Sequence, residues 1–122
     1  MSIENLLKSA ADLGIPSGPF GALTTYRTGG QARGFVTFNS REALVAMGAE
    51  LASCERITVL GNGSNMLVAD GEYDGLVVRL GESFTSLVID ATEQGRAFIT
   101  IGAALDLPIA ARRISDSGFT GF

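Results

Sequence analysis

The residues best suited to chemistry in this sequence form a glycine-rich turn, LGNGSNML, at positions 60–67. Gly61 and Gly63 stand at alternate positions in it. Glycines spaced in this way allow positive φ angles and can direct successive main-chain N–H groups into one concavity that binds phosphate oxygens. Ser64 and Asn65 would add side-chain donors. By spacing alone, a plain tight turn between buried strands is the simpler interpretation, because Asn-Gly is a favoured turn pair.

Two common phosphate-binding motifs do not fit this turn. A P-loop needs a Gly-Lys-Ser/Thr ending, whereas the only lysine of the chain is Lys8. A dinucleotide fingerprint needs a third glycine that opens a helix, but Met66 stands there and strand-like residues follow. The sequence therefore disfavours ATP hydrolysis and NAD binding, and it leaves other pyrophosphates open.

A second glycine-rich turn, YRTGG, occupies positions 26–30. In it, Arg27 could pair with a phosphate and Tyr26 could pack on a planar ring, while Gly29 and Gly30 would permit close backbone approach. A surface loop with an exposed arginine and a half-buried tyrosine is the alternative. Two such turns, each after a short extended run, form a more specific pair than either alone.

The elements that must position these turns are predicted from periodicity and end signals. We expect a first helix capped by Ser2, a loop over 15–19, an extended run over 23–30, and a helix over 41–53 with Asn39 at its cap. We expect a hairpin with its turn over 92–95, and a last helix between Asp106 and Gly118. Strands are predicted at 34–38, 57–60 (buried on both faces), 66–68, 76–80, 84–89 and 97–101. Helices and strands are mixed before Gly81, whereas a hairpin and one helix are expected after it. This change in the expected elements predicts a boundary between two lobes near Gly81.

Composition excludes several functional classes. The net charge of −4 and the lack of a basic stripe argue against nucleic-acid binding. The absence of histidine removes histidine-based metal sites and Ser-His or Cys-His catalysis. A single cysteine, Cys54, allows no internal disulfide and fits a reducing compartment. With no signal peptide and no membrane-length apolar run, we expect a cytoplasmic protein that binds neither membrane nor metal.

Three segments together resemble a known family. They are LTTYRTGG from Leu23, LGNGSNMLVADGEYDGLVVRLG from Leu60, and the final GFTGF, in this order and at these separations. They resemble the UDP-N-acetylenolpyruvoylglucosamine reductases. The resemblance implies an α+β, two-lobed FAD-binding fold of the vanillyl-alcohol-oxidase type, with a first FAD-binding lobe over 1–80 and an incomplete second lobe over 81–122.

The resemblance also implies which residues hold the cofactor. The turn from Gly61 to Asn65 would wrap the FAD pyrophosphate, and the YRTGG turn would lie along the cofactor. The implied FAD-binding residues are Tyr26, Arg27, Thr28, Gly29, Gly61, Asn62, Gly63, Ser64, Asn65, Gly102, Thr120 and Gly121. Two positions depart from the family pattern: Thr24 replaces a frequent asparagine, and Ala104 replaces a glycine.

The implied activity is reduction of UDP-N-acetylglucosamine enolpyruvate to UDP-N-acetylmuramate, a step of peptidoglycan biosynthesis, with FAD as cofactor and NADPH as co-substrate. The sequence ends on aromatic residues, and no catalytic residue of the family falls within it. We therefore expect the UDP-sugar to bind a downstream domain, the parent to be a monomer, and these 122 residues alone to be inactive. Another oxidoreductase of the same fold, or a non-catalytic nucleotide-binding module, remains an alternative.

Overall fold

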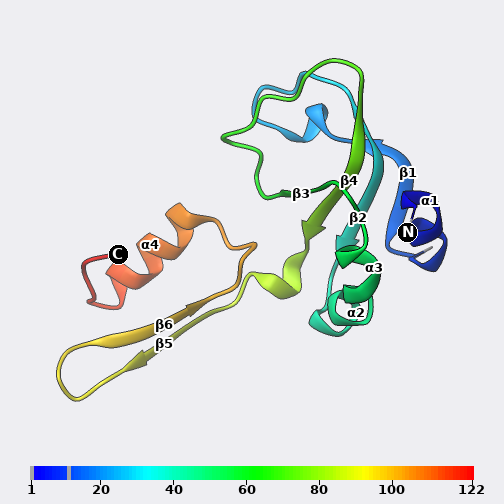
Figure 1. Ribbon diagram of the computed structural model, residues 1–122. Helices are drawn as coiled ribbons and strands as arrows, with labels where there is room; N and C mark the ends of the chain where they lie inside the picture. The colour runs from blue at the N-terminus through cyan, green and yellow to red at the C-terminus, as the bar shows by residue number, and fades with distance from the viewer. Residues whose placement is uncertain (1, 11) are drawn as a thin grey trace. The chain divides into compact units, whose positions relative to one another are not determined.

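The computed structural model describes residues 2–10 and 12–122 as a mixed α+β chain. It divides into two compact units, the first ending at Leu80 and the second spanning Gly81–Phe122 (Figure 1). This boundary lies at the position near Gly81 where the sequence predicts a change in the kind and order of its elements. The α+β class is confirmed, and the FAD-binding role of each lobe stays a prediction.

The first unit is built on a four-stranded sheet with the order β1-β2-β4-β3. Strand β1 pairs antiparallel with β2, whereas β2 and β3 both run parallel to β4. Three short helices and one 3₁₀ turn connect or cover these strands. The elements are α1 (Ile3–Ser9), β1 (Gly14–Pro19), η1 (Gly21–Leu23), β2 (Gln31–Phe38), α2 (Arg41–Ala46), α3 (Gly48–Ala52), β3 (Ile57–Leu60) and β4 (Glu72–Leu80).

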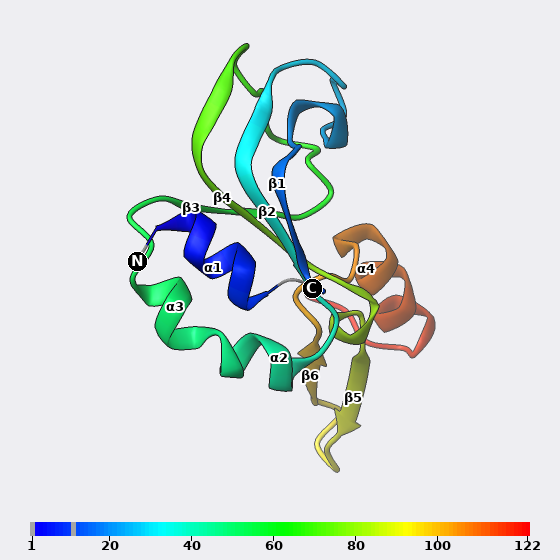
Figure 2. The same ribbon diagram turned by 90° about the vertical axis from the view of Figure 1, so that its right-hand side faces the viewer.

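The connection from β3 to β4 decides how one face of the sheet is covered. Because neighbouring parallel strands need a crossover, the chain between them must return over a face of the sheet. Residues 61–71 make this return without a helix, and we call them the crossover loop. Met66 and Val68 of this loop pack on a core cluster formed by Phe20, Ala32, Phe35, Leu60 and Val77. Helices α1, α2 and α3 lie on the opposite face of this sheet (Figure 2).

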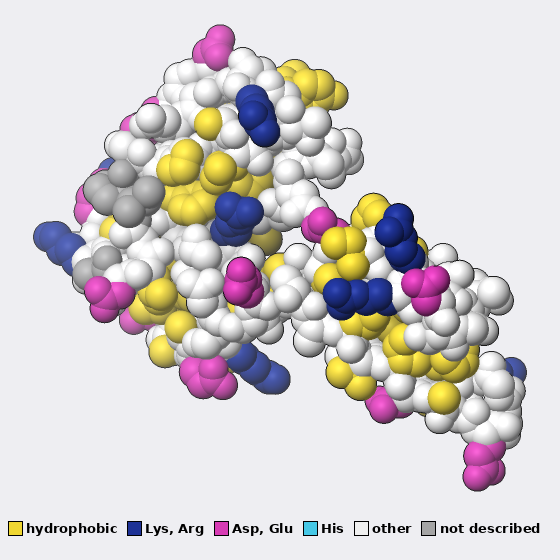
Figure 3. All heavy atoms as spheres, turned by 180° about the vertical axis from the view of Figure 1, so that it is seen from behind, with side chains coloured by type: hydrophobic (Ala, Val, Ile, Leu, Met, Phe, Trp, Pro, Cys, Tyr) yellow, Lys and Arg dark blue, Asp and Glu magenta, His cyan; other side chains and the backbone are white. Residues whose placement is uncertain are grey.

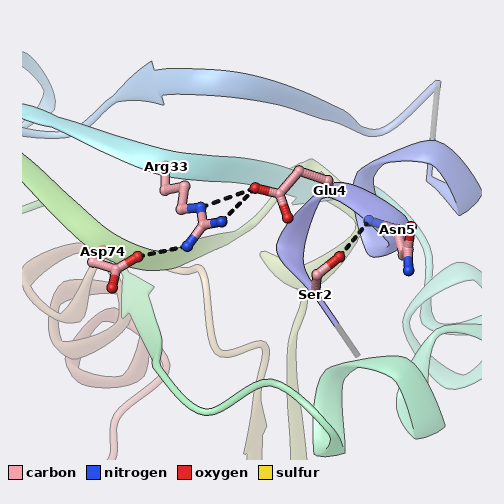
Figure 4. A network of polar contacts seen from close by, with 5 residues as sticks. All are labelled: Ser2, Glu4, Asn5, Arg33 and Asp74. Atoms are coloured by element: carbon pink, nitrogen blue, oxygen red, sulfur yellow. Dashed lines mark hydrogen bonds and ion pairs between the residues drawn. The ribbon is translucent and has the colours of Figure 1, made fainter.

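Helix α1 is fixed to that other face by its cap, its apolar side and an ion-pair network. The Ser2 side chain accepts a hydrogen bond from the Asn5 N–H, which confirms the predicted cap. Leu6 and Leu7 are buried. Arg33 of β2 donates to Glu4 of α1 and, at 2.8 Å, to Asp74 of β4 (Figure 4). One guanidinium therefore links three elements.

Two expectations about strands are wrong because pairing and sheet position overrode the local pattern. The predicted loop over 15–19 is strand β1, which pairs with β2 from Gly14↔Val36 to Pro19↔Gln31. Proline is tolerated there because β1 is an edge strand. Strand β3 is the other edge, and it is not buried on both faces, because Val59 is 64% exposed.

Three further expectations are corrected in the turns and helices. Residues 23–30 are not extended: a 3₁₀ turn is followed by irregular chain, and residues 66–68 form no strand. The helix over 41–53 is interrupted at Met47, just before Gly48, a poor helix former. Its cap is Ser40, which accepts a hydrogen bond from the Ala43 N–H, and not Asn39.

The second unit contains a β-hairpin and one helix. Its elements are η2 (Glu82–Phe84), β5 (Leu87–Ala91), β6 (Ala97–Ile101) and α4 (Leu107–Asp116). Strands β5 and β6 pair antiparallel around the predicted turn, in which Gly95 has a φ of 70°. The strand predicted from Phe84 begins only at Leu87. Helix α4 lies within its predicted bounds and buries Ala110 and Ile114.

Each unit by itself exposes some apolar side chains among charged ones, as Figure 3 shows. In the first unit Leu67 of the crossover loop is 74% exposed, and in the second unit Phe98 of β6 is 75% exposed. Scattered exposed apolar residues are ordinary on protein surfaces. An assignment of function therefore needs the geometry of the glycine-rich turns.

Candidate functional site

The turn from Gly61 to Asn65 opens the crossover loop, directly after β3. Gly63 has a φ of 63°, a region that glycine occupies at little cost, as the sequence predicts. Gly61 does not have a positive φ. It is exposed, and a Cβ atom on it would meet no atom within 4 Å. The turn therefore has one inward glycine and one glycine that faces open space.

Gly63 is the inward glycine because it packs against the segment that precedes the second motif. A Cβ atom on Gly63 would lie 2.7 Å from the Cα of Thr24 and 2.8 Å from the carbonyl oxygen of Leu23. The Thr25 N–H donates a hydrogen bond of 3.0 Å to the Gly63 carbonyl. The fold thus brings together two glycine-rich turns that are separated by 29 residues of sequence, positions 31–59 (Figure 1).

The second motif is held against the later part of the same crossover loop. A Cβ atom on Gly29 would overlap the Val68 carbonyl, and one on Gly30 would overlap the Gly71 carbonyl. The Gly30 N–H donates to the Ala69 carbonyl at 2.9 Å. The close backbone approach that these glycines permit is therefore an approach to the crossover loop. Contact of Gly29 with a cofactor stays a prediction.

The turn from Gly61 to Asn65 carries groups that can bind an anion. The main-chain N–H groups of Gly61, Gly63, Ser64 and Asn65 donate to no main-chain carbonyl of the residues that the structure describes. Ser64 and Asn65 are exposed, as is Asn62. Successive main-chain N–H groups can form an anion-binding concavity without any formal charge. An overall negative chain can hold a phosphate in this way.

The turn that contains Arg27 adds a positive charge to the same unit. Arg27 has a φ of 52°, unusual for a residue with a side chain, and its N–H donates to the Thr24 carbonyl at 3.1 Å. Tyr26 is 64% exposed, and Thr28 is exposed as well. The half-buried tyrosine of the alternative interpretation is therefore not found, and the aromatic ring is exposed to solvent. Strained backbone of this type is frequent at functional sites.

Sequence reasoning missed a cleft beside these turns. It has a volume of about 390 Å³ and its apolar walls come from Phe20, Tyr73 and the middle of the crossover loop. The Phe20 and Tyr73 rings lie 5.4 Å apart between centroids, and the Tyr73 hydroxyl is 2.9 Å from the Thr58 hydroxyl. In the sequence, Phe20 lies between Gly18 and Gly21, and Tyr73 lies between Gly71 and Gly75. The cleft depends on pairing distant in sequence.

The other predicted site residues belong to the second unit. Gly102 follows β6 and donates its N–H to the Ser86 carbonyl at 2.8 Å, and a Cβ atom on it would overlap the Phe84 carbonyl. Thr120 lines a groove with the hairpin turn at the start of β6. Gly121 is exposed and has a φ of 89°. Gly102 and Thr120 therefore lie toward opposite ends of β6, and their cofactor roles stay predictions.

Two other reactive features have structural explanations. Burial raises the pKa of the half-buried Cys54 thiol, so this thiol is a weaker nucleophile than a free one. Of the acidic residues around Gly71, Asp74 is engaged by Arg33. The described residues contain no group of three or more cysteine, aspartate or glutamate side chains arranged to hold a metal ion. None of the described helices is long and apolar enough to cross a membrane.

Comparison with known proteins finds similar proteins that all carry the same name. The chain is 34% identical over 103 residues to the UDP-N-acetylenolpyruvoylglucosamine reductase of Azorhizobium caulinodans, which covers 84% of this chain and 32% of the relative. It is 34% identical to that of Parvibaculum lavamentivorans and 31% identical to that of Desulforamulus reducens. Each of these two alignments covers 98% of this chain and, respectively, 36% and 37% of the relative.

No model of a protein family matches the chain. The chain spans about a third of the length of the curated relatives that it matches. The alignments with P. lavamentivorans and D. reducens nevertheless include both glycine-rich turns and both units, since they cover almost the whole chain. On this similarity, the chain belongs to the UDP-N-acetylenolpyruvoylglucosamine reductase family.

Proposed function

We propose that this chain is the FAD-binding part of a flavin-dependent UDP-N-acetylenolpyruvoylglucosamine reductase, with the two units as lobes of a vanillyl-alcohol-oxidase-type fold. The observation that carries the proposal is the junction of the two glycine-rich turns through Thr25 and Gly63. In the Gly61–Asn65 turn, several main-chain N–H groups donate to no main-chain carbonyl of the described residues, and Gly61 has open space around its Cβ position. A pyrophosphate group fits this donor set.

Each part of the joined turns would have a separate role. The N–H groups of Gly61 and of Gly63 to Asn65 would hold the pyrophosphate oxygens, with Ser64 and Asn65 as side-chain donors. Arg27 would pair with the phosphate charge, and the exposed Tyr26 ring would pack on a planar part of the cofactor. Gly102 and the Thr120–Gly121 turn would contribute from the second unit.

The parent protein would use bound FAD for hydride transfer from NADPH to the enolpyruvyl double bond of a UDP-sugar. The product would be UDP-N-acetylmuramate, which would place the parent in peptidoglycan biosynthesis, and with it in cell shape and cell division. We propose that the parent works as a cytoplasmic monomer and binds the UDP-sugar outside the residues described here. We therefore expect no reductase turnover from these 122 residues alone.

The proposal is tested by titrating the purified chain with FAD, FMN and riboflavin and following flavin fluorescence. FAD should bind at least about tenfold more tightly than riboflavin, a difference of 1.4 kcal/mol, because only FAD carries the pyrophosphate. Its affinity should fall as salt is added, since the Arg27 contribution is electrostatic. Equal affinity for FAD and riboflavin would show that the turns do not bind pyrophosphate. No binding of FAD at millimolar concentration would contradict the proposed function itself.

A further inference from the structure

Among the residues that the structure describes, Thr24 is the polar residue that is buried, with 4% of its surface exposed. Its hydroxyl donates a hydrogen bond of 2.8 Å to the Gly21 carbonyl. A buried hydroxyl without a partner would destabilise the fold, so this bond accounts for its presence in the interior. It does not explain why a polar residue stands there, since an apolar residue of the same shape would also fill the space.

The main chain of Thr24 joins two successive turns. Its N–H also donates to the Gly21 carbonyl, at 3.1 Å, and its own carbonyl accepts the Arg27 N–H at 3.1 Å. The hydroxyl and the N–H therefore hold the same carbonyl from two directions and fix the orientation of the Thr24 peptide groups. The turn that carries Tyr26 and Arg27 starts from this fixed point.

Thr24 also contacts the other glycine-rich turn. The site of a Cβ atom on Gly63 lies 2.7 Å from the Thr24 Cα and 3.3 Å from its Cβ. The next residue, Thr25, makes the hydrogen bond to the Gly63 carbonyl. A small rotation of the Thr24 backbone would thus move the Thr25 N–H and the surface on which Gly63 packs. Both turns would shift together.

We propose that Thr24 is a positioning residue for the cofactor: its hydroxyl fixes the arginine turn and the Gly61–Asn65 turn in the relative placement that FAD binding requires. This inference rests on the proposed function, because the ligand is the same. The N–H groups of a concavity bind an anion well only when they are held in place beforehand, since ordering them on binding costs conformational entropy. Loss of the hydroxyl would therefore weaken binding more than it weakens the fold.

The test compares Thr24→Val with Thr24→Ser and with a matched control, Thr85→Val. Valine keeps the shape of threonine and removes the hydroxyl, whereas serine keeps the hydroxyl. Thr85 has the same local arrangement: after a 3₁₀ turn, its hydroxyl and its N–H both donate to the carbonyl three residues earlier, that of Glu82. It lies in the second unit, whereas both glycine-rich turns lie in the first.

Three measurements are made on each variant: the dissociation constant for FAD, hydrogen exchange of the Thr25 amide without FAD, and the urea midpoint. Thr24→Val should bind FAD about tenfold more weakly and exchange the Thr25 amide about tenfold faster. Thr24→Ser should restore both quantities to within about threefold of the starting protein. Thr85→Val should leave both quantities unchanged, whatever its effect on the urea midpoint.

The outcomes separate this inference from the proposed function. If Thr24→Val binds FAD as tightly as the starting protein, Thr24 does not position the site. If the starting protein itself binds no FAD, the proposed function fails and the cofactor role of Thr24 fails with it. The amide exchange then still decides the structural claim: unchanged protection of Thr25 in Thr24→Val would show that the hydroxyl does not fix the turns at all.

Discussion

A Cβ atom on Gly30 would overlap the carbonyl oxygen of Gly71, so these two backbones touch directly. The Gly30 N–H also donates to the Ala69 carbonyl at 2.9 Å. Gly30 lies just before β2 and Gly71 just before β4, and β2 and β4 pair in parallel from Gln31↔Glu72 onward. The loop residues that directly precede β2 and β4 are therefore in contact, next to the first paired residues of the two strands.

Gly30→Ala should destabilise the fold through this contact. The added methyl group must displace main-chain atoms, which do not yield as a flexible side chain does, so we expect a loss of about 3 kcal/mol in unfolding free energy. Gly48→Ala is the control, because a Cβ atom there meets no atom within 4 Å. It should change the unfolding free energy by less than about 1 kcal/mol. Urea denaturation followed by circular dichroism measures both, and equal midpoints for the two variants would contradict the contact.

Gly61→Val should leave the fold intact and weaken FAD binding. Gly61 has open space around its Cβ position and no positive φ, so a valine side chain fits there without a clash. It would then occupy space that we propose for the pyrophosphate. We expect at least a tenfold, about 1.4 kcal/mol, loss of FAD affinity in the fluorescence titration. Gly48→Val, remote from the turns, serves as the control. Unchanged FAD affinity in Gly61→Val would exclude an anion site on this face of the turn.

Gly63→Val is a poorer test of FAD binding than Gly61→Val. The sequence suggests it, because Gly63 is the central glycine of the motif and has a positive φ. In the fold, the new side chain would collide with Thr24 and Leu23 before it reached any ligand. We expect Gly63→Val to lower the urea midpoint even in the absence of flavin, which the same denaturation measurement checks. A midpoint equal to that of Gly61→Val would contradict the packing of Gly63 on Thr24.

Acid should weaken the attachment of α1 to the sheet. The pKa of Glu4 is lowered from its ordinary value of 4.5 by a hydrogen bond from main-chain N–H and by the Arg33 guanidinium. A carboxyl group with a lower pKa in the folded chain stabilises it above the ordinary value, and this stabilisation is lost as pH falls through the folded value. The urea midpoint should therefore decrease as pH falls below 4.5. In Glu4→Gln the decrease should be smaller; an identical pH profile would show that Glu4 does not contribute.

Cys54 should react slowly with alkylating reagents. Burial raises the pKa of its thiol from the ordinary value of 9.0, so less thiolate is present at a given pH. At about pH 8 we expect alkylation by iodoacetamide to be roughly tenfold slower in the folded chain than in urea. Mass spectrometry over time measures both rates. Equal rates would show that the folded structure does not protect this thiol.

Several elements could be predicted from the sequence because their signals are local. The Ser2 cap, the hairpin turn closed by Gly95 and the last helix all depend on residues within a few positions of each other. The two glycine-rich turns were recognised for the same reason. Their order and spacing also sufficed for the family resemblance, which the similarity to the reductase of Parvibaculum lavamentivorans supports over 98% of the chain.

Other features were decided by tertiary structure alone. Strand β1 forms despite its prolines because β2 offers it an edge to pair with, and β3 is the edge strand on the other side, with Val59 exposed. The junction of Thr25 with Gly63, the contact of Gly30 with Gly71 and the burial of Thr24 depend on the path of the crossover loop over the sheet. No local pattern encodes that path, because it follows from β3 and β4 pairing in parallel as neighbours. The sequence therefore determined which residues could form an anion site, and the parallel pairing of β3 with β4 decided that two distant segments would meet.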